Sequence, residues 1–144
     1  MAELIDLKRL ANQAGYKIWV EERVRQVDTD MQGHVNNAVF ATYFEIARTA
    51  MAPALALRPP GSFSIVARQV IHYQAELTFP SIIRIGVAVA KMGNRSYDLA
   101  HAIFRDGVCV ASGEIAHVLF DSATRRSVPL PQPFREALEA LLLP

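Results

Sequence analysis

Hydrophobic and polar positions at the start of the chain follow two different periods. Residues 2–14 carry apolar side chains at a helical spacing, and this pattern ends at Gly15. From Tyr16 to Val27, apolar and charged residues alternate instead. Alternation of this kind is typical of a strand that has one face in water. The pattern therefore predicts a short N-terminal helix followed by a half-buried strand.

A mostly apolar segment follows at residues 38–52, and its only charged residues are Glu45 and Arg48. These two residues are three positions apart, so a helix places them on one face. A helix that is apolar around most of its circumference has to be covered nearly all round. The segment is therefore predicted to be a buried central helix, which ends at Pro53.

The rest of the chain is rich in β-branched and aromatic residues that are interrupted by turn-forming residues. Asp106-Gly107 predicts a tight hairpin, because both residues tolerate positive φ angles. One strand, one buried helix and four further strands predict a single α+β domain over residues 1–144, in which a five-stranded antiparallel sheet wraps round the central helix. The four later strands are expected at 62–73, 81–90, 96–105 and 108–120, and a short amphipathic helix at 134–142.

Composition narrows the classes of function. The 144 residues include 15 basic and 14 acidic side chains, so no charged stripe suits a nucleic-acid backbone. We expect a cytoplasmic protein, because no secretory signal and no apolar run of about 20 residues is present. The lone Cys109 excludes an intrachain disulfide and is interpreted as a buried, inert thiol. Neither a metal site nor a cofactor is expected, since no two histidines have a ligand spacing; the histidines are His34, His72, His101 and His117.

The polar stretch 28–37 carries the candidate chemistry. It leads from the first strand past Asp30 and into the central helix through Asn36 and Asn37, which are good N-cap residues. A helix N-terminus offers free N–H groups that can bind a carbonyl oxygen or an oxyanion. A carboxylate beside such a site is the minimum apparatus for attack on an acyl carbon. The alternative is structural: Asp28 in particular is interpreted as a turn former, and His34 as a loop residue bound to a backbone carbonyl.

The run Asp-Thr-Asp-x-x-Gly-His-Val-Asn-Asn at 28–37, followed by Tyr-Phe-Glu-x-Ala-Arg at 43–48, resembles the hotdog-fold thioesterases of the hydroxybenzoyl-CoA thioesterase-like branch. The resemblance implies hydrolysis of an acyl thioester, carried by coenzyme A or an acyl-carrier protein, to a carboxylic acid and a free thiol. It implies that Asp30 is the catalytic nucleophile or general base and that the backbone amide of Asn37 polarises the carbonyl. Gly33 lets the loop pass close to the substrate, and His34 and Asn36 lie in the substrate-binding region.

Further positions follow from the same resemblance. Glu45 is the rival catalytic carboxylate, because other hotdog thioesterases take theirs from the central helix. Alternatively, Glu45 only pairs with Arg48. Arg95 and Ser96 resemble the stretch that meets the nucleotide or pantetheine arm, although an exposed arginine after a turn is an equal interpretation.

The resemblance also implies a homodimer, joined edge to edge through the strand at 62–73, with active sites at the interface. This strand contains Ile65, Val66, Val70 and Ile71 and little edge-protecting charge. The sequence leaves open whether dimers pair into a homotetramer, which acyl group is hydrolysed, and whether residues 50–57 line an acyl chain. Two other functions remain as alternatives: a non-catalytic acyl-thioester binding protein, and a hotdog hydratase or dehydratase.

Overall fold

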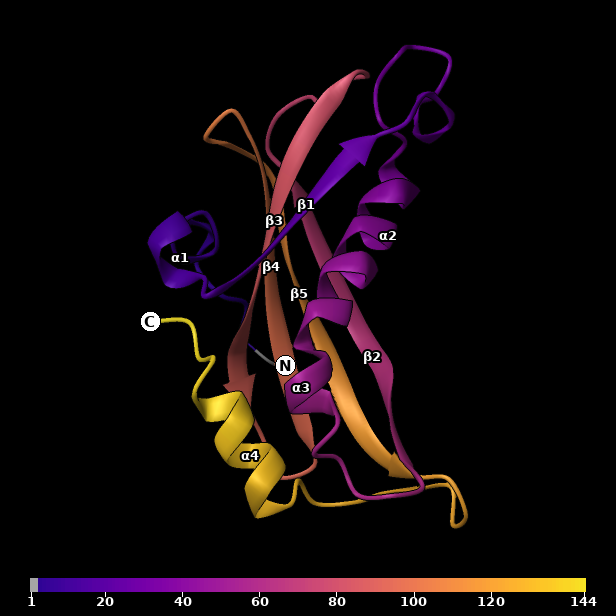
Figure 1. The fold of residues 1–144 in the computed structure, drawn as a ribbon, viewed down its shortest axis with the longest axis vertical. Coiled ribbons are helices and arrows are strands. Elements are labelled where there is room, and N and C mark those ends of the chain that lie inside the picture. The colour runs from indigo at the N-terminus through magenta and orange to yellow at the C-terminus, as the bar shows by residue number, and fades with distance from the viewer. Residues whose placement is uncertain (1–2) are drawn as a thin grey trace.

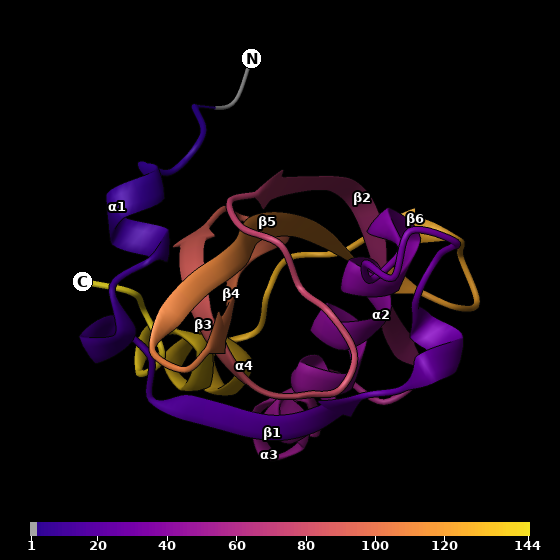
Figure 2. The same cartoon turned by 90° about the horizontal axis from the view of Figure 1, so that it is seen from above.

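The structure is a computed structural model that describes residues 3–144 of the chain. Its main feature is a curled antiparallel sheet with strand order β1-β3-β4-β5-β2, wrapped round one central helix (Figures 1 and 2). The strands are β1 (Ile18–Val24), β2 (Ser62–Tyr73), β3 (Ser81–Met92), β4 (Ser96–Arg105), β5 (Val108–Asp121) and β6 (Arg126–Ser127). The α-helices are α1 (Leu7–Leu10), α2 (Asn37–Arg48), α3 (Ala52–Leu55) and α4 (Gln132–Glu139).

The predicted α+β hotdog architecture is confirmed, including the five long strands and the short terminal helices. The two-residue strand β6, which pairs with β5, was not predicted. The hairpin between β4 and β5 has positive φ angles at both Asp106 and Gly107, as the sequence predicted.

Helix α2 forms the core together with the concave face of the sheet. Its side chains Phe40, Phe44 and Ala47 are buried, whereas Glu45 is exposed. Inward-facing apolar side chains of β3, β4 and β5 complete this core. Gly113 permits the close packing, because a Cβ atom there would lie 3.1 Å from the Phe44 ring and would overlap the carbonyl oxygen of Val70 in β2. Each buried large apolar side chain contributes roughly 1.5–3 kcal/mol to folding.

Several predicted element boundaries are wrong. Within the described part of the predicted helix 2–14, α1 covers only Leu7–Leu10, because Asp6 caps its first turn and Asn12 caps a separate 3₁₀ turn. Strand β1 ends at Val24, since residues 26–28 form another 3₁₀ turn. The central helix ends at Arg48, and its apolar continuation forms a 3₁₀ turn and then α3.

The segment around α1 and the last residues of the chain meet on the outer side of the sheet. The guanidinium of Arg9 donates hydrogen bonds to the carbonyl oxygens of Leu143 and Pro144, each at 3.0 Å. The hydroxyl of Tyr16 donates to the carbonyl of Leu10 at 2.7 Å and so fastens α1 to the start of β1. Over residues 3–144, no helix has the length and apolar character needed to cross a membrane.

Candidate active site

The loop between β1 and α2 is closed by backbone hydrogen bonds. The amide of Asp30 donates to the carbonyl of His34 at 2.8 Å, and Thr29 forms an isolated antiparallel bridge with Val35. Val35 is in turn held by the carbonyl of Leu77 at 2.8 Å, just before β3. The loop is therefore an ordered hairpin that is anchored to the sheet.

The carboxylate of Asp30 lies at the exposed tip of this hairpin. Its Oδ1 accepts hydrogen bonds from the amides of Gln32, at 2.8 Å, and His34, at 3.2 Å. Its Oδ2 accepts no hydrogen bond from any of the residues 3–144. Gly33 has a φ of +82°, a conformation that would cost roughly 1–2 kcal/mol with a Cβ atom present. The local chain thus holds one oxygen of Asp30 and leaves the other accessible.

The N-terminus of α2 lies at the far end of the same hairpin. Asn36 is the N-cap, and its side chain accepts a hydrogen bond from the amide of Ala38 at 3.0 Å. The amide of Asn37, the first helical residue, has no acceptor within the described chain. The start of a helix concentrates such unpaired donors and a partial positive charge. A carbonyl oxygen is the group that this N–H can bind.

An open hollow of about 310 Å³ adjoins this helix terminus. The hydroxyl of Tyr73, at the end of β2, donates to the carbonyl of Asn37 at 3.1 Å and closes one side. Nε2 of His34 lies 3.4 Å from the Glu76 carboxylate, so its ring faces a side chain and not the backbone carbonyl of the structural alternative. The lining residues are His34, Val35, Asn37, Phe40, Tyr73, Gln74, Ala75, Glu76 and Leu77. Two of the predicted site residues, His34 and Asn37, therefore line one hollow, and Asp30 joins them through the amide of His34.

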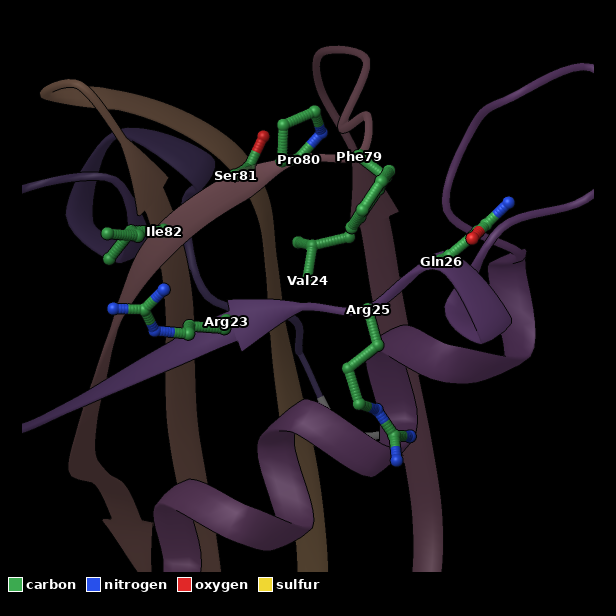
Figure 3. A pocket seen from close by; sticks show the side chains of 8 residues that line it. All are labelled: Arg23, Val24, Arg25, Gln26, Phe79, Pro80, Ser81 and Ile82. Carbon is green, nitrogen blue, oxygen red and sulfur yellow. The ribbon is translucent and has the colours of Figure 1, made fainter.

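A larger hollow of about 590 Å³ lies between the end of β1 and the start of β3 (Figure 3). Its lining is largely apolar, with Val24, Phe79 and Ile82 around it, and Arg25 points away from Phe79. None of the residues 28–37 lines it. We therefore place the candidate chemistry beside the smaller hollow, which is lined by Asn37 with its free N–H and by His34, whose amide binds the carboxylate of Asp30.

Asp28 has surroundings opposite to those of Asp30. It is 2% exposed, and its carboxylate accepts hydrogen bonds from the Arg25 side chain and from the hydroxyl of Tyr43. Burial raises the pKa of Asp28, but the hydrogen bonds from Arg25 and Tyr43 outweigh burial and bring the pKa below its ordinary value. Asp28 is therefore a buried, ionised structural group.

Two predicted site positions lie away from Asp30 within the chain. Glu45 follows Asn37 by eight residues, which is about 12 Å along the helix axis, and its carboxylate is 2.8 Å from the Arg48 guanidinium. Arg95 and Ser96 lie at the opposite end of the sheet. Ser96 pairs with Val118 of β5, whereas Tyr73 pairs with Ala111 of the same strand. These two partners are seven residues, or about 23 Å, apart along β5. One chain alone does not bring Arg95 to Asp30.

The sequence pattern missed two tyrosines that shape the site, Tyr43 and Tyr73. Their contacts with Asp28 and Asn37 join residues 15 and 36 positions apart, so only the packing of α2 and β2 reveals them. Cys109 is half-buried, not fully buried as predicted, and burial raises the pKa of its thiol to about 11. No group of three or more potential metal ligands occurs among residues 3–144.

Comparison with known proteins agrees with this geometry. Residues 24–138 match the model of the thioesterase-like superfamily. The chain belongs to this superfamily.

Among solved structures, the PA5185 protein from Pseudomonas aeruginosa is 30% identical, with a TM-score of 0.80 over 91% of this chain and 95% of that one. A thioesterase from Thermus thermophilus, solved with coenzyme A and Zn, is also 30% identical, with a TM-score of 0.76 over 88% and 95% of the two chains. The DHNA-CoA thioesterase from Staphylococcus aureus, at 21% identity and a TM-score of 0.76 over 85% and 89%, shares the fold.

Proposed function

We propose that this protein hydrolyses an acyl-CoA thioester, with Asp30 as the catalytic carboxylate. One observation carries the proposal: a single closed hairpin presents Oδ2 of Asp30 at its tip and leads directly to the N–H of Asn37. Neither atom has a hydrogen-bond partner among residues 3–144. Membership of the thioesterase-like superfamily supports thioester hydrolysis as the class of reaction.

The two groups have complementary roles in the reaction. The N–H of Asn37 donates to the thioester oxygen and stabilises the negative charge that develops on it during attack. Loss of one such donor typically costs about 3–4 kcal/mol of transition-state stabilisation. Asp30 either attacks the carbonyl carbon to form an acyl anhydride, which water then hydrolyses, or takes a proton from a water molecule that attacks. In both routes the carbon–sulfur bond breaks, and the products are a carboxylic acid and a thiol.

Coenzyme A as the carrier of the acyl group rests on two lines of support. The Thermus thermophilus relative was solved with coenzyme A. Arg95 supplies a guanidinium that suits a phosphate, on an exposed turn at the far end of the sheet. We propose that Arg95 reaches the site of a partner subunit. Antiparallel pairing of two β2 edges would place the Arg95 end of one sheet beside the hairpin end of the other.

The test is hydrolysis of a panel of acyl-CoA thioesters, from acetyl to palmitoyl and including benzoyl and phenylacetyl, followed with a thiol-reactive dye. We expect turnover by the parent protein and a loss of 100-fold or more in kcat for Asp30→Asn, on the order expected for removal of the attacking group or general base.

The matched control is Asp106→Asn, which removes another exposed carboxylate, at the β4–β5 turn, and should leave kcat unchanged. Full turnover by folded Asp30→Asn, with loss in Glu45→Gln, would transfer the catalytic role to Glu45. Absence of turnover with every acyl-CoA would contradict the proposal and favour a carrier-protein substrate or a binding function.

A further inference from the structure

The carboxylate of Asp28 is buried two residues before Asp30 and is fully engaged. Its Oδ2 accepts a hydrogen bond from the backbone amide of Arg25 at 2.8 Å and from the hydroxyl of Tyr43 at 2.9 Å. Its Oδ1 accepts one from the Arg25 guanidinium at 2.8 Å. We call Arg25, Asp28 and Tyr43 the Asp28 cluster.

The Asp28 cluster joins both ends of the hairpin at residues 28–37 to the central helix. Arg25 belongs to the segment that leaves β1, and Tyr43 lies in the second turn of α2. The backbone carbonyl of Asp28 also accepts a hydrogen bond from the amide of the N-cap residue Asn36, at 2.9 Å. One residue therefore contacts the strand end, the helix interior and the helix start at once.

The charges in the cluster stabilise these contacts. Asp28 remains ionised, since its hydrogen bonds hold its pKa below the ordinary value. Burial and the neighbouring carboxylate raise the pKa of Tyr43, so its hydroxyl stays protonated and keeps donating. The Arg25 side chain is 68% exposed, but the carboxylate it binds is 3% exposed, which separates this pair from an ordinary surface ion pair.

We propose that the Asp28 cluster is a positioning network that sets the place of the Asp30 carboxylate relative to the free N–H of Asn37. This inference rests on the proposed function. None of the three residues lines the hollow at the helix start, so the network acts through the hairpin and not by touching substrate. A misplacement of about 1 Å at a catalytic group can cost on the order of 100-fold in rate.

The main test variant is Tyr43→Phe, which retains the buried ring and its edge contact with Phe40 at 6.3 Å and removes only the hydroxyl. We expect kcat to fall about tenfold with KM within about twofold, because the free amide and Asp30 are retained but misplaced. Arg25→Ala should give a similar loss, and Arg25→Lys should restore part of it by keeping one charged donor.

The matched control is Tyr16→Phe, another buried tyrosine, whose hydroxyl bonds to a backbone carbonyl near α1. It should lower stability to a similar extent and leave kcat unchanged. Equal kcat values for Tyr43→Phe and Tyr16→Phe would overturn the positioning role and leave only a structural one.

A second measurement does not depend on hydrolysis. Amide hydrogen exchange at His34 and Asn36 should be faster in Tyr43→Phe than in Tyr16→Phe, since the hairpin and N-cap lose their tie to α2. Unchanged exchange at these amides would contradict the inference even if the parent protein proves to have no thioesterase activity. A parent without activity, combined with faster exchange, would refute the proposed function alone.

Discussion

At the scale of the residue, identical side chains have opposite roles because of where the backbone places them. Asp28 and Asp30 are two positions apart, yet one carboxylate is buried among three donors and the other is exposed with one oxygen unbound by residues 3–144. The sequence pattern assigned Asp28 to the turn, which its buried contacts support, and the family resemblance assigned Asp30 to the chemistry, which stays a prediction. It adds Tyr43 as the partner of Asp28, which the pattern did not predict.

Buried histidines provide a residue-scale prediction about pH. Burial is the largest cause that lowers the pKa of His101 to about 3 and that of His117 to about 4. An unfolded chain binds protons at these residues below about pH 6.5. In the folded protein the pKa values of both histidines lie below 6.5. The unfolding free energy is therefore highest above about pH 6.5 and decreases as the pH falls towards 4. At pH 5, each residue costs roughly 2 kcal/mol of unfolding free energy.

His101→Phe should therefore reduce the loss of unfolding free energy between pH 7.5 and pH 5 by about 2 kcal/mol. The new phenyl ring takes the place of the His101 imidazole, whose centroid lies 4.8 Å from that of the Phe44 ring in a stacked arrangement. The measurement is urea unfolding at both pH values. Ile103→Val, on the same face of β4, is the control and should lower stability equally at both. An unchanged pH dependence in His101→Phe would contradict this account of the buried ring.

At the scale of the element, strand β2 is a sheet edge with unprotected apolar side chains. Ile65 is 37% exposed and Val66 is 47% exposed, and β2 pairs with β5 on one side only within the described chain. Long apolar edges of this kind favour pairing with another strand. The edge position agrees with the dimer that the family resemblance implies.

Val66→Lys tests the edge. In a dimer that pairs through β2, a lysine near the middle of the strand would bring two like charges together across the twofold axis, so that dimer should weaken at least tenfold. Light scattering over a range of concentrations would then show a shift towards the 15.9 kDa monomer. Val108→Lys, at a position 57% exposed on β5, should not change the mass. A dimer of undiminished affinity in Val66→Lys would argue against pairing through β2.

Strand positions were predictable because alternation and turn residues are local signals. The β2 and β4 boundaries match their predicted ranges, and the hairpin at Asp106 follows from backbone preference alone. Helix ends were less predictable. The apolar pattern continues beyond Arg48, but the chain there changes to a 3₁₀ turn, which preserves burial without preserving the α-helix.

At the scale of the whole molecule, the hairpin at residues 28–37 and the Arg95 turn occupy opposite ends of one sheet. Hydrophobic periodicity predicts the sheet itself but not which ends of two copies meet. The part of the candidate site that lies in one hairpin, residues 28–37, was therefore predictable from the sequence. The tyrosine contacts and the position of Arg95 depend on tertiary structure.

A mixing experiment tests whether the site is shared between subunits. Asp30→Asn and Arg95→Glu should each be impaired alone. If Asp30 and Arg95 act together across the interface, exchanging subunits of the two variants restores one intact site in half of the dimers, so about a quarter of parental activity returns. The measurement is acyl-CoA hydrolysis before and after subunit exchange. Recovery no greater than the average of the two variants would place both residues in the same subunit's site or remove Arg95 from it.

The hydrogen bonds from Arg9 to the carbonyl oxygens of Leu143 and Pro144 fasten the segment around α1 to the last residues of the chain. They lie on the outer side of the sheet, away from the hairpin at residues 28–37. Loss of the Arg9 guanidinium is therefore expected to loosen α1 and the last residues together while the hairpin stays in place. By the same geometry, a reporter domain fused after Pro144 would remain remote from the hairpin at residues 28–37.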